Sequence, residues 1–412
     1  MMLLYIDPGT GSMLFSVVIG VAATLYFSVR APFLKLKVSF FAKDARTAND
    51  ASAVVPYVIY CEGRQYFNEF SAVVEEFEER KLPLVYYSGS EEDPVLAKQW
   101  EFVKPEYIGS GNKAYAKLNF LKADIVLMTT PALDVYQLKR SKDVKEYVHI
   151  LHAPSDATGY RLFGLDFFDA VLLTGDYQKK DIRYLEKKRN LKPKELVTVG
   201  CTYLDVLDAK RKSITTVEHP FTVLVSPSWG KSALLFRYGA KLLDPLVESG
   251  LEVIVRPHPQ SRIVEQGMLE TLEKRYEGKK NLSWDFGSDN SQALSKADIM
   301  ISDFSGIIFD YTFLYDKPVM YVKQDFDKRP YDAGDVEDEM WQFTSLHRFG
   351  IELQESDFPR IGDVLRLASD SEELRKARET AKAEAWMHQG HAAGQVVDFL
   401  VGTETKLKEQ KH

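Results

Sequence analysis

The sequence predicts an α/β protein built from two doubly wound parallel sheets. Short apolar runs rich in β-branched residues alternate with amphipathic helical segments, and this alternation is typical of parallel strands covered by helices on both faces. The alternation stops over the charged residues 201–220 and restarts at Phe221, which indicates a hinge or linker. Two doubly wound halves with a cleft between them is the simplest arrangement that satisfies both observations.

The individual elements follow from hydrophobic periodicity. The apolar residues of the segment 67–80 recur at helical spacing and should face the sheet, namely Phe70, Val73, Val74 and Phe77. In the first half we expect strands at 54–61, 84–87, 124–128, 148–151, 171–174 and 197–199, and helices at 67–80 and 176–189. In the second half we expect strands at 221–225, 251–255, 299–301 and 318–322, and helices at 231–249 and 263–276. A helical tail at 371–399 is interrupted around Gly390.

Composition limits the class of protein. A chain of 412 residues is long enough for two or more domains. The net charge of −7 gives no overall basic field, so nucleic acid is not an expected partner. Cys61 and Cys201 are the only cysteines and have no paired spacing, which excludes a disulfide framework or a cysteine-based zinc site and fits a reducing compartment.

The N-terminal segment differs from the rest of the chain. Residues 8–29 include no charged residue, and a bilayer core of about 30 Å needs about 20 residues of helix to cross it. Asp7 precedes this stretch and several basic residues follow it, so the positive-inside rule predicts a single span with the bulk of the chain in the cytoplasm. A cleaved signal peptide usually begins with a basic leader, which is missing here. We therefore expect an uncleaved anchor in the inner (cytoplasmic) membrane.

These patterns divide the chain into four parts. Residues 1–46 form a membrane anchor and a basic juxtamembrane segment, whose apolar residues either lie along the membrane surface or form a core strand. Residues 47–205 and 206–385 form two Rossmann-like domains. Residues 386–412 form a C-terminal helix and tail.

Polar clusters follow two strands of the second half. Arg256 and His258 follow one strand. Asp303, Ser305 and Gly306 follow the other, where Ser305 and Gly306 open a helix. Ligands of parallel sheets bind beyond the carboxyl ends of the strands, and a helix N-terminus favours an anion through its free N–H groups and dipole. Arginine forks two hydrogen bonds onto a phosphate, histidine donates one, and glycine allows close approach. Together the clusters predict a phosphate or nucleotide site.

Each of these clusters also has a purely structural interpretation. Asp303 or Ser305 would then cap the helix, and Arg256 would pair with a carboxylate. Asp310, one turn into the same helix, accepts hydrogen bonds from ligand hydroxyls in one interpretation and favours the positive helix end in the other.

A third strand-to-helix turn adds Ser226, Ser228 and Lys231, which supply hydroxyls and a cation. Its glycine spacing is not that of a Walker loop, and the chain has no Gly-x-Gly-x-x-Gly motif, which argues against a dinucleotide redox enzyme. Asp325 and Asp327 form an Asp-x-Asp pair of the kind that holds a divalent cation, but Lys and Arg side chains surround it. A salt-bridged loop is therefore favoured, and we predict no metal site.

His152 is the expected general base. It follows the strand 148–151 and precedes a proline turn, a position on the rim of the cleft, and its ordinary pKa suits proton transfer near neutrality. The alternative is a histidine hydrogen-bonded for structure. We expect that role for His149, which strand alternation directs to the opposite face.

The second half contains four further sequence motifs: Ser226-Pro-Ser-Trp229, Arg256-Pro-His-Pro259, Asp303-Phe-Ser-Gly306 with Phe309-Asp-Tyr311, and Lys317-Pro-Val-Met-Tyr321. These motifs resemble those of the CDP-glycerol glycerophosphotransferase family, which acts in the synthesis of wall teichoic acid and related cell-envelope polymers and has the GT-B architecture. The resemblance spans about residues 220–325, and His152 with Pro154 is similar to the family's His-Gly-x-Pro element. Ala153 replaces the glycine of that element, and Gly306 replaces the family's second serine.

The resemblance implies a transferase that needs no cofactor, and the predicted N-terminal span would anchor it in the membrane. It would move glycerol phosphate, or a related polyol phosphate or sugar unit, from a donor such as CDP-glycerol to a membrane lipid-linked acceptor. The second domain would bind the donor nucleotide and the first the acceptor. His152 would act as general base on the acceptor hydroxyl. His258 and Arg256 would neutralise the pyrophosphate as CMP leaves, and Ser305 with Gly306 would grip it.

Two other functions compete with this one. UDP-N-acetylglucosamine 2-epimerases share the GT-B architecture and a similar Arg-Pro-x-x-Pro element, but they are soluble and use several carboxylates in the cleft. The N-terminal span and the Phe309-Asp-Tyr311 context weigh against them. The third hypothesis is a non-catalytic nucleotide-binding scaffold, which predicts binding without turnover.

Overall fold

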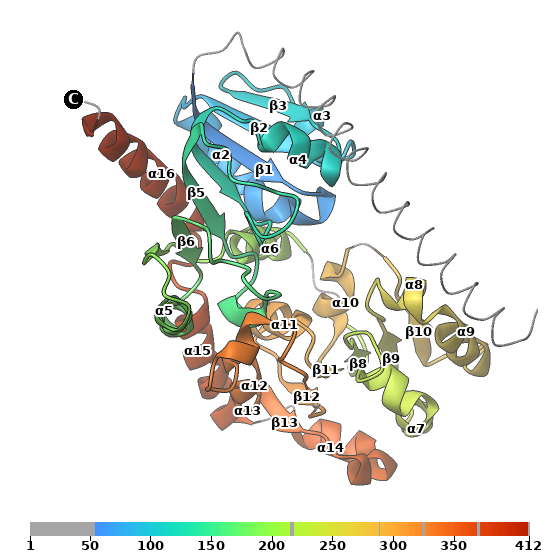
Figure 1. The fold of residues 1–412 in the computed structure, drawn as a ribbon. Helices are drawn as coiled ribbons and strands as arrows, with labels where there is room; N and C mark the ends of the chain where they lie inside the picture. The colour runs from blue at the N-terminus through green and yellow to red at the C-terminus, as the bar shows by residue number, and fades with distance from the viewer. Residues whose placement is uncertain (1–53, 215–217, 288, 324–325, 369–370, 411–412) are drawn as a thin grey trace, which may run out of the picture.

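The computed structural model describes residues 54–214, 218–287, 289–323, 326–368 and 371–410, and it folds into two α/β domains (Figure 1). The anchor predicted within residues 1–46 lies outside the described residues. In the part that is described, no helix has both the length and the apolar character needed to cross a membrane.

The first domain contains a seven-stranded parallel sheet over its described residues, in the order β3-β2-β1-β4-β5-β6-β7. The chain enters at the centre, runs to one edge and then crosses to the other, which is the doubly wound arrangement expected from the sequence. The strands are β1 (Val55–Cys61), β2 (Leu84–Ser88), β3 (Val103–Tyr107), β4 (Ala123–Met128), β5 (Val144–Ile150), β6 (Ala170–Leu173) and β7 (Glu195–Thr198). The helices are η1 (Arg64–Tyr66), α2 (Phe67–Glu79), α3 (Pro94–Ala97), α4 (Asn112–Leu118), η2 (Ala157–Gly159), η3 (Asp176–Gln178), α5 (Lys179–Lys188) and α6 (Thr202–Lys212).

The second domain repeats this arrangement around a parallel sheet that has six strands in the described ranges, in the order β10-β9-β8-β11-β12-β13. Its strands are β8 (Thr222–Val225), β9 (Glu252–Val255), β10 (Leu282–Trp284), β11 (Ile299–Ser302), β12 (Val319–Tyr321) and β13 (Gly350–Glu352). Its helices are α7 (Leu234–Glu248), α8 (Ser261–Val264), α9 (Gln266–Arg275), α10 (Ser291–Lys296), α11 (Ile307–Tyr315), η4 (Asp332–Asp335), α12 (Trp341–Thr344), α13 (Leu346–Phe349), η5 (Glu355–Arg360), α14 (Ile361–Ala368) and α15 (Glu372–Ala385).

Hydrophobic periodicity locates the central elements correctly. Every residue of β4, β8 and β11 is buried, as expected for parallel strands covered on both faces. The predicted inner face of α2 is also confirmed, because Phe70, Val73, Val74 and Phe77 are fully buried.

The strands that the sequence did not predict lie at sheet edges. β3 contains Pro105 and alternates between buried and more exposed residues, while β10 and β13 have three residues each. Proline and short polar strands are typical of edges, where one side of the strand has no partner. Such strands give too short an apolar run to be recognised without the neighbouring strand.

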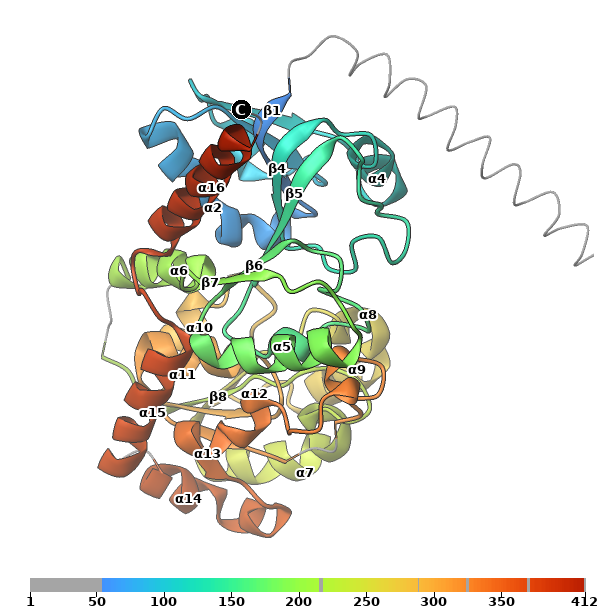
Figure 2. The ribbon, with the colours of Figure 1, turned by 60° about the vertical axis from the view of Figure 1, so that its left-hand side comes forward.

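The region between the domains is more ordered than predicted. Residues 202–212, expected in a hinge or linker, form helix α6, so the predicted domain boundary at 205/206 falls inside a helix. Helix α16 (Ala392–Glu409) returns to the first domain and lies beside α2 (Figure 2). Asp205 fixes this return, because its carboxylate accepts hydrogen bonds from Trp386 Nε1 and from the backbone N–H groups of Gly390 and Ala392.

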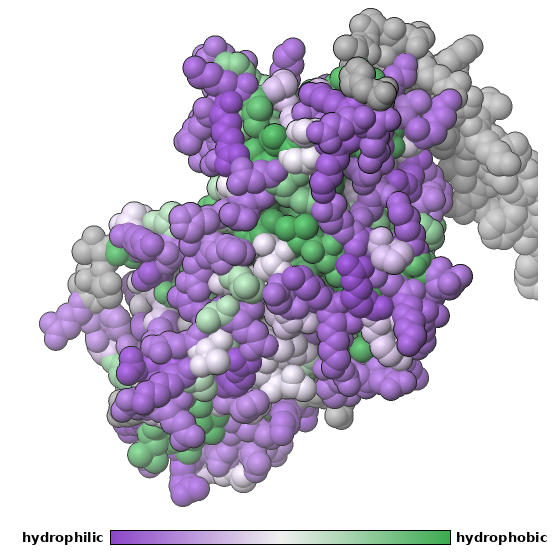
Figure 3. All heavy atoms as spheres, turned by 90° about the vertical axis from the view of Figure 1, so that its left-hand side faces the viewer, coloured by the Kyte–Doolittle hydropathy of each residue, from purple (hydrophilic) through white to green (hydrophobic). Residues whose placement is uncertain are grey.

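A segment of the second domain, residues 330–342, docks against the first domain. The backbone of Asp332 donates to the carbonyl of Tyr160 at 2.8 Å, and Asp156 accepts from the backbone N–H groups of Trp341 and Gln342 at 2.7 and 2.8 Å. Figure 3 shows hydrophilic residues over most of one face and apolar ones gathered mainly near its middle, where the domains meet.

Arg189 joins the same segment to α5. Its guanidinium contacts Asp166 at 2.8 Å in the first domain, and Asp332 and Asp335 at 2.7 Å in the second. The side chains of Arg189, Asp166 and Asp332 are each less than a tenth exposed. Removing the arginine would therefore leave buried carboxylates without their cation.

We predict that Arg189→Ala lowers the free energy of unfolding by about 3–5 kcal/mol, because it breaks buried ion pairs from one side. Arg64→Ala is the matched control, since Arg64 pairs with Glu92 on the surface, where both side chains are more than half exposed. That variant should lose less than about 1 kcal/mol. Urea unfolding of both variants measures the difference, and equal losses would contradict the role assigned to Arg189.

Candidate functional site

A cavity of about 240 Å³ lies between the two domains. His152 lines it together with residues that follow β5 and enclose η2, and the second domain supplies the opposite wall. The first-domain lining is Leu151, His152, Ala153, Ser155, Asp156, Gly159 and Tyr160, and the second-domain lining is Phe326, Tyr331, Met340 and Gln342. His152 therefore lies in the cleft between the domains. This position was predicted because His152 directly follows a strand.

His152 and His149 both contact the hydroxyl of Tyr160. His152 Nδ1 lies 3.1 Å from the hydroxyl and His149 Nε2 lies 3.0 Å from it. The prediction that His149 points to the opposite face was wrong, because β5 ends at Ile150 and strand alternation does not extend to His152. Burial lowers the pKa of His152, so its imidazole is neutral around pH 7, which is the form that accepts a proton.

The predicted phosphate-binding turns lie at one edge of the second sheet. Ile301 pairs with Val225, and Val225 pairs with Val255, so the residues that follow β8, β9 and β11 are neighbours. The backbone of Ser226 donates to Ile301, and that of Arg256 donates to Val225, which extends the pairing beyond the strands. Ser226 itself is buried, and Ser302 Oγ donates to its carbonyl at 2.7 Å, so Ser226 lies beneath the surface of the edge.

Asp303 joins two of these turns and does not face the solvent. One carboxylate oxygen accepts from the backbone N–H of Ser228 and the other from that of Leu234, both at 2.8 Å. The side chain is 1% exposed, and burial raises its pKa while the backbone donors lower it. The prediction that Asp303 binds the donor is corrected, because a buried carboxylate that already accepts backbone hydrogen bonds positions the turn and cannot reach a ligand.

Arg256 pairs with a carboxylate, as the purely structural interpretation of this residue predicted. Its Nη1 donates to Asp285, and its Nη2 donates to the carbonyl of Gly287 at 2.7 Å. The residue is 9% exposed. In this arrangement Arg256 holds the segment after β10 against the end of β9, and direct contact with a phosphate stays a prediction.

His258 has a defined hydrogen-bonding direction. Its Nδ1 accepts from the backbone N–H of Gln260 at 3.1 Å, so the neutral ring carries its proton on Nε2. Burial lowers the pKa of His258, which keeps the ring neutral at pH 7. The indole of Trp229 lies 6.3 Å away between ring centroids. His258 can therefore donate a hydrogen bond to an anion through Nε2.

The N-terminus of α11 is accessible. Gly306, its N-cap residue, is exposed, and a Cβ added there would meet no atom within 4 Å. The geometry thus leaves space for a ligand but does not itself require glycine. Ser305 and Ser228 are half-buried and Lys231 is exposed, so all three side chains are at least partly open to solvent in the turns that follow β8 and β11.

Asp310 faces the first domain. Its carboxylate accepts from the hydroxyl of Tyr203 in α6 at 2.8 Å, and burial raises its pKa to about 7. The prediction that Asp310 binds ligand hydroxyls is corrected, because α11 turns this side chain inward toward α6.

Glu69 lies close to Asp310 and was missed by the sequence prediction. It is 4% exposed, and its Oε2 has no hydrogen-bond partner among the described residues. Burial raises its pKa to about 8, with a smaller contribution from Asp310. The sequence could have predicted its burial, because Glu69 lies four residues before Val73 and eight before Phe77, at the helical spacing of the buried face of α2.

We predict that Glu69 contributes stability that is fully present below about pH 4.5 and is lost as pH rises toward 8, because folded Glu69 keeps a proton that the unfolded chain releases. Glu69→Gln removes this dependence. The difference between the Tm of the variant and that of wild type should therefore be about 2–4 °C more favourable to the variant in alkaline buffer than in acidic buffer. Calorimetry across this range is the measurement. Glu79→Gln, on an exposed position of the same helix, should follow wild type, and a parallel Glu69→Gln curve would contradict the assignment.

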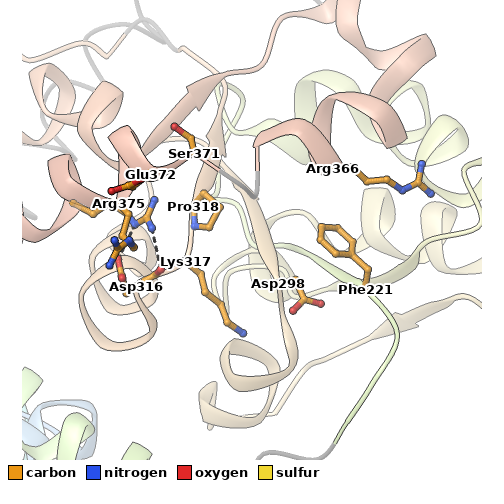
Figure 4. A pocket seen from close by; sticks show the side chains of 10 residues that line it. Phe221, Asp298, Asp316, Lys317, Pro318, Arg366, Ser371, Glu372 and Arg375 are labelled. Atoms are coloured by element: carbon orange, nitrogen blue, oxygen red, sulfur yellow. Dashed lines mark hydrogen bonds and ion pairs between the residues drawn. The ribbon is translucent and has the colours of Figure 1, made fainter.

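A larger open pocket of about 750 Å³ lies at the other end of the second sheet (Figure 4). Phe221, Asp298 and Pro318 line it, and these residues precede β8, β11 and β12. Its basic groups are engaged locally, with Arg378 on Asp316 and Lys317 Nζ on the carbonyl of Ser295. This pocket is at the amino end of the strands and is separate from the predicted phosphate site.

The described residues contain no group of three or more His, Cys, Asp or Glu side chains arranged to hold a metal ion. Asp327 pairs with Arg329 at 2.7 Å, while Asp325 lies outside the described residues. The expectation that the reaction needs no metal or other cofactor stays a prediction.

Comparison with known proteins finds a family resemblance over the second domain. Residues 218–399 match the family described as CDP-Glycerol:Poly(glycerophosphate) glycerophosphotransferase. The match covers all of the turns at the candidate phosphate site. A search of curated proteins finds no match to the sequence.

Two solved structures have a fold similar to that of this chain. A variant of the wall teichoic acid polymerase TagF soaked with CDPG has a TM-score of 0.56 at 14% identity, over 96% of this chain and 99% of that one. UDP-GlcNAc 2-epimerase from Neisseria meningitidis, bound to UDP-GlcNAc, has a TM-score of 0.54 at 14% identity, over 85% of this chain and 100% of that one. At such identities the likeness shows the GT-B-like fold alone.

Proposed function

We propose that this chain is a glycerophosphotransferase. It would transfer glycerol phosphate, or a related polyol phosphate or sugar unit, from a CDP-activated donor to a hydroxyl of a membrane lipid-linked acceptor, as in teichoic acid synthesis. The observation that carries the proposal is the neutral imidazole of His152 in a cavity walled by both domains. The family match over the second domain supports a cytidine nucleotide as the donor.

The donor is proposed to lie at the carboxyl edge of the second sheet. The backbone N–H groups at Ser305 and Gly306 and the Nε2–H of His258 would bind the pyrophosphate. Ser228 and Lys231 border the same edge and would complete the anion site. Neutral donors and a helix dipole stabilise charge well where water is excluded, so the site does not depend on Arg256 leaving Asp285.

The acceptor hydroxyl is proposed to enter the cavity beside His152. His152 takes the hydroxyl proton while the oxygen forms a bond to the phosphorus of the glycerol phosphate. The bond from that phosphorus to the bridging oxygen breaks, and its electron pair leaves with CMP. His258 and the N-terminus of α11 stabilise the negative charge that develops on the leaving phosphate.

We predict that His152→Ala lowers kcat by about 10²–10⁴-fold with the Kd for CDP-glycerol unchanged, because only a general base is lost. His258→Ala should lower kcat by about 10²–10³-fold and weaken donor binding, because it removes a donor to the pyrophosphate. CMP release from CDP-glycerol in the presence of membrane extract measures turnover, and calorimetric titration measures affinity.

His347→Ala is the matched control for both variants, because His347 is exposed on α13. It should behave as wild type. Unchanged CMP release from the His152 and His258 variants would contradict the catalytic assignment. Epimerisation of UDP-N-acetylglucosamine without CMP release would favour the epimerase alternative, and donor binding without turnover would favour a scaffold.

The N-terminal segment is proposed to hold the enzyme at its acceptor. The uncharged residues 8–29 and the basic residues after them favour a single span in the inner membrane, with both domains in the cytoplasm. We predict that the full chain stays in the membrane pellet after alkaline carbonate extraction, while a chain without residues 1–46 is released. Extraction of the full chain by carbonate would contradict the anchor.

A further inference from the structure

The hydroxyl of Tyr160 lies between two imidazole rings. His149 belongs to β5, His152 follows the end of that strand, and Tyr160 follows η2. The hydroxyl oxygen is 3.0 Å from His149 Nε2 and 3.1 Å from His152 Nδ1. Both contacts have ordinary hydrogen-bond length, so the three side chains form one continuous chain of hydrogen bonds.

His149, at one end of this chain of hydrogen bonds, is enclosed by the protein. His149 is 0% exposed, and its ring packs against Tyr160 at 5.2 Å and against Phe168 at 4.9 Å between centroids. Its Nδ1 has no hydrogen-bond partner in the part of the chain that the structure describes. The near end is different, because His152 lines the interdomain cavity. Tyr160 occupies Nδ1 of that ring, so Nε2 is the nitrogen left for a substrate.

The number of protons allows two arrangements. In the first, the Tyr160 O–H donates to His149 Nε2, and His152 donates its Nδ1–H to the Tyr160 oxygen. In the second, every donor is reversed, and His152 then carries its proton on Nε2. Only the first arrangement leaves a lone pair on His152 Nε2, which is the atom that must accept a proton from the acceptor hydroxyl.

We propose that Tyr160 and His149 are positioning residues that hold His152 in the tautomer protonated on Nδ1, with Nε2 free to act as base. This inference rests on the proposed function and extends it to two residues that the sequence did not indicate for this role. His149 supplies the acceptor for the Tyr160 proton, and Tyr160 supplies the acceptor for the His152 proton.

The surrounding residues keep the three hydrogen-bonded side chains uncharged. Burial lowers the pKa of His149 to about 3, so the ring accepts a hydrogen bond without taking the proton. Burial, with smaller contributions from Tyr66 and Glu69, raises the pKa of Tyr160, so its hydroxyl keeps its proton. Tyr66 also packs edge-on against His152, at 6.0 Å between centroids.

The arrangement also matters after proton transfer. When His152 Nε2 takes the acceptor proton, the ring becomes a cation with N–H groups on both nitrogens. Its Nδ1–H then donates to the Tyr160 oxygen, which bears partial negative charge because its own proton points to His149. The developing imidazolium is thereby stabilised inside a partly buried site without a carboxylate partner.

The first test compares variants that remove one of these hydrogen bonds with variants that keep it. Tyr160→Phe and His149→Leu should each lower kcat roughly 10- to 100-fold with KM changed less than about threefold, because orientation of the base is lost and the donor site is intact. His149→Gln places an amide oxygen near the position of Nε2 and should recover most of kcat. Tyr136→Phe, at a position 57% exposed, is the control and should match wild type.

The second test does not depend on activity. The ¹⁵N spectrum of histidine-labelled wild-type protein, assigned with His152→Gln, should show His152 protonated on Nδ1 near neutral pH, and Tyr160→Phe should lose this preference. His152 protonated on Nε2 in the wild type, or Tyr160→Phe with kcat within about threefold of wild type, would overturn the proposal. Failure of CMP release from CDP-glycerol with the expected tautomer present would instead contradict only the proposed function.

Discussion

The two domains depend on carboxylates that accept backbone N–H groups from the opposite side of the cleft. Asp156 of the first domain accepts from Trp341 and Gln342, and Asp332 of the second accepts from Phe163 and Gly164. An ionised carboxylate makes stronger hydrogen bonds than a neutral acceptor, and backbone donors hold it in a fixed direction. These contacts keep residues 330–342 over η2, and the interdomain cavity beside His152 exists because that segment forms its second wall.

The candidate site uses oriented dipoles more than free charges. The cation expected to grip a phosphate, Arg256, is neutralised by Asp285, and the carboxylate of Asp303 is turned inward onto backbone N–H groups. An anion at this edge would meet the N-terminus of α11 and the Nε2–H of His258, both fixed in direction before binding. Fixed dipoles need no rearrangement when charge develops, which is the property that a phosphate-transfer site requires.

The sequence predicted the fold where an element buries a continuous apolar surface. The central strands and the inner face of α2 were correct for this reason, whereas β10 and β13 were missed because three-residue edge strands leave no such pattern. At the site, proximity to strand ends correctly predicted that His152 lies in the interdomain cavity and that the turns after β8, β9 and β11 lie at one edge of the second sheet. Glu69 was missed because a charged residue is expected to be exposed, even though helical spacing places it on the buried face of α2. Tyr160 was missed because it lies in an irregular loop.

Local pattern alone determined the α/β class, the two doubly wound halves and the edge of each sheet that carries the polar residues, because parallel strands all end at the same side. Tertiary structure alone decided which polar side chains reach that edge. Asp303 and Asp310 have the residue type and spacing of ligand-binding groups, yet backbone donors and Tyr203 hold them inside. The direction of a side chain depends on partners distant in sequence, and the position of a residue after a strand does not reveal those partners.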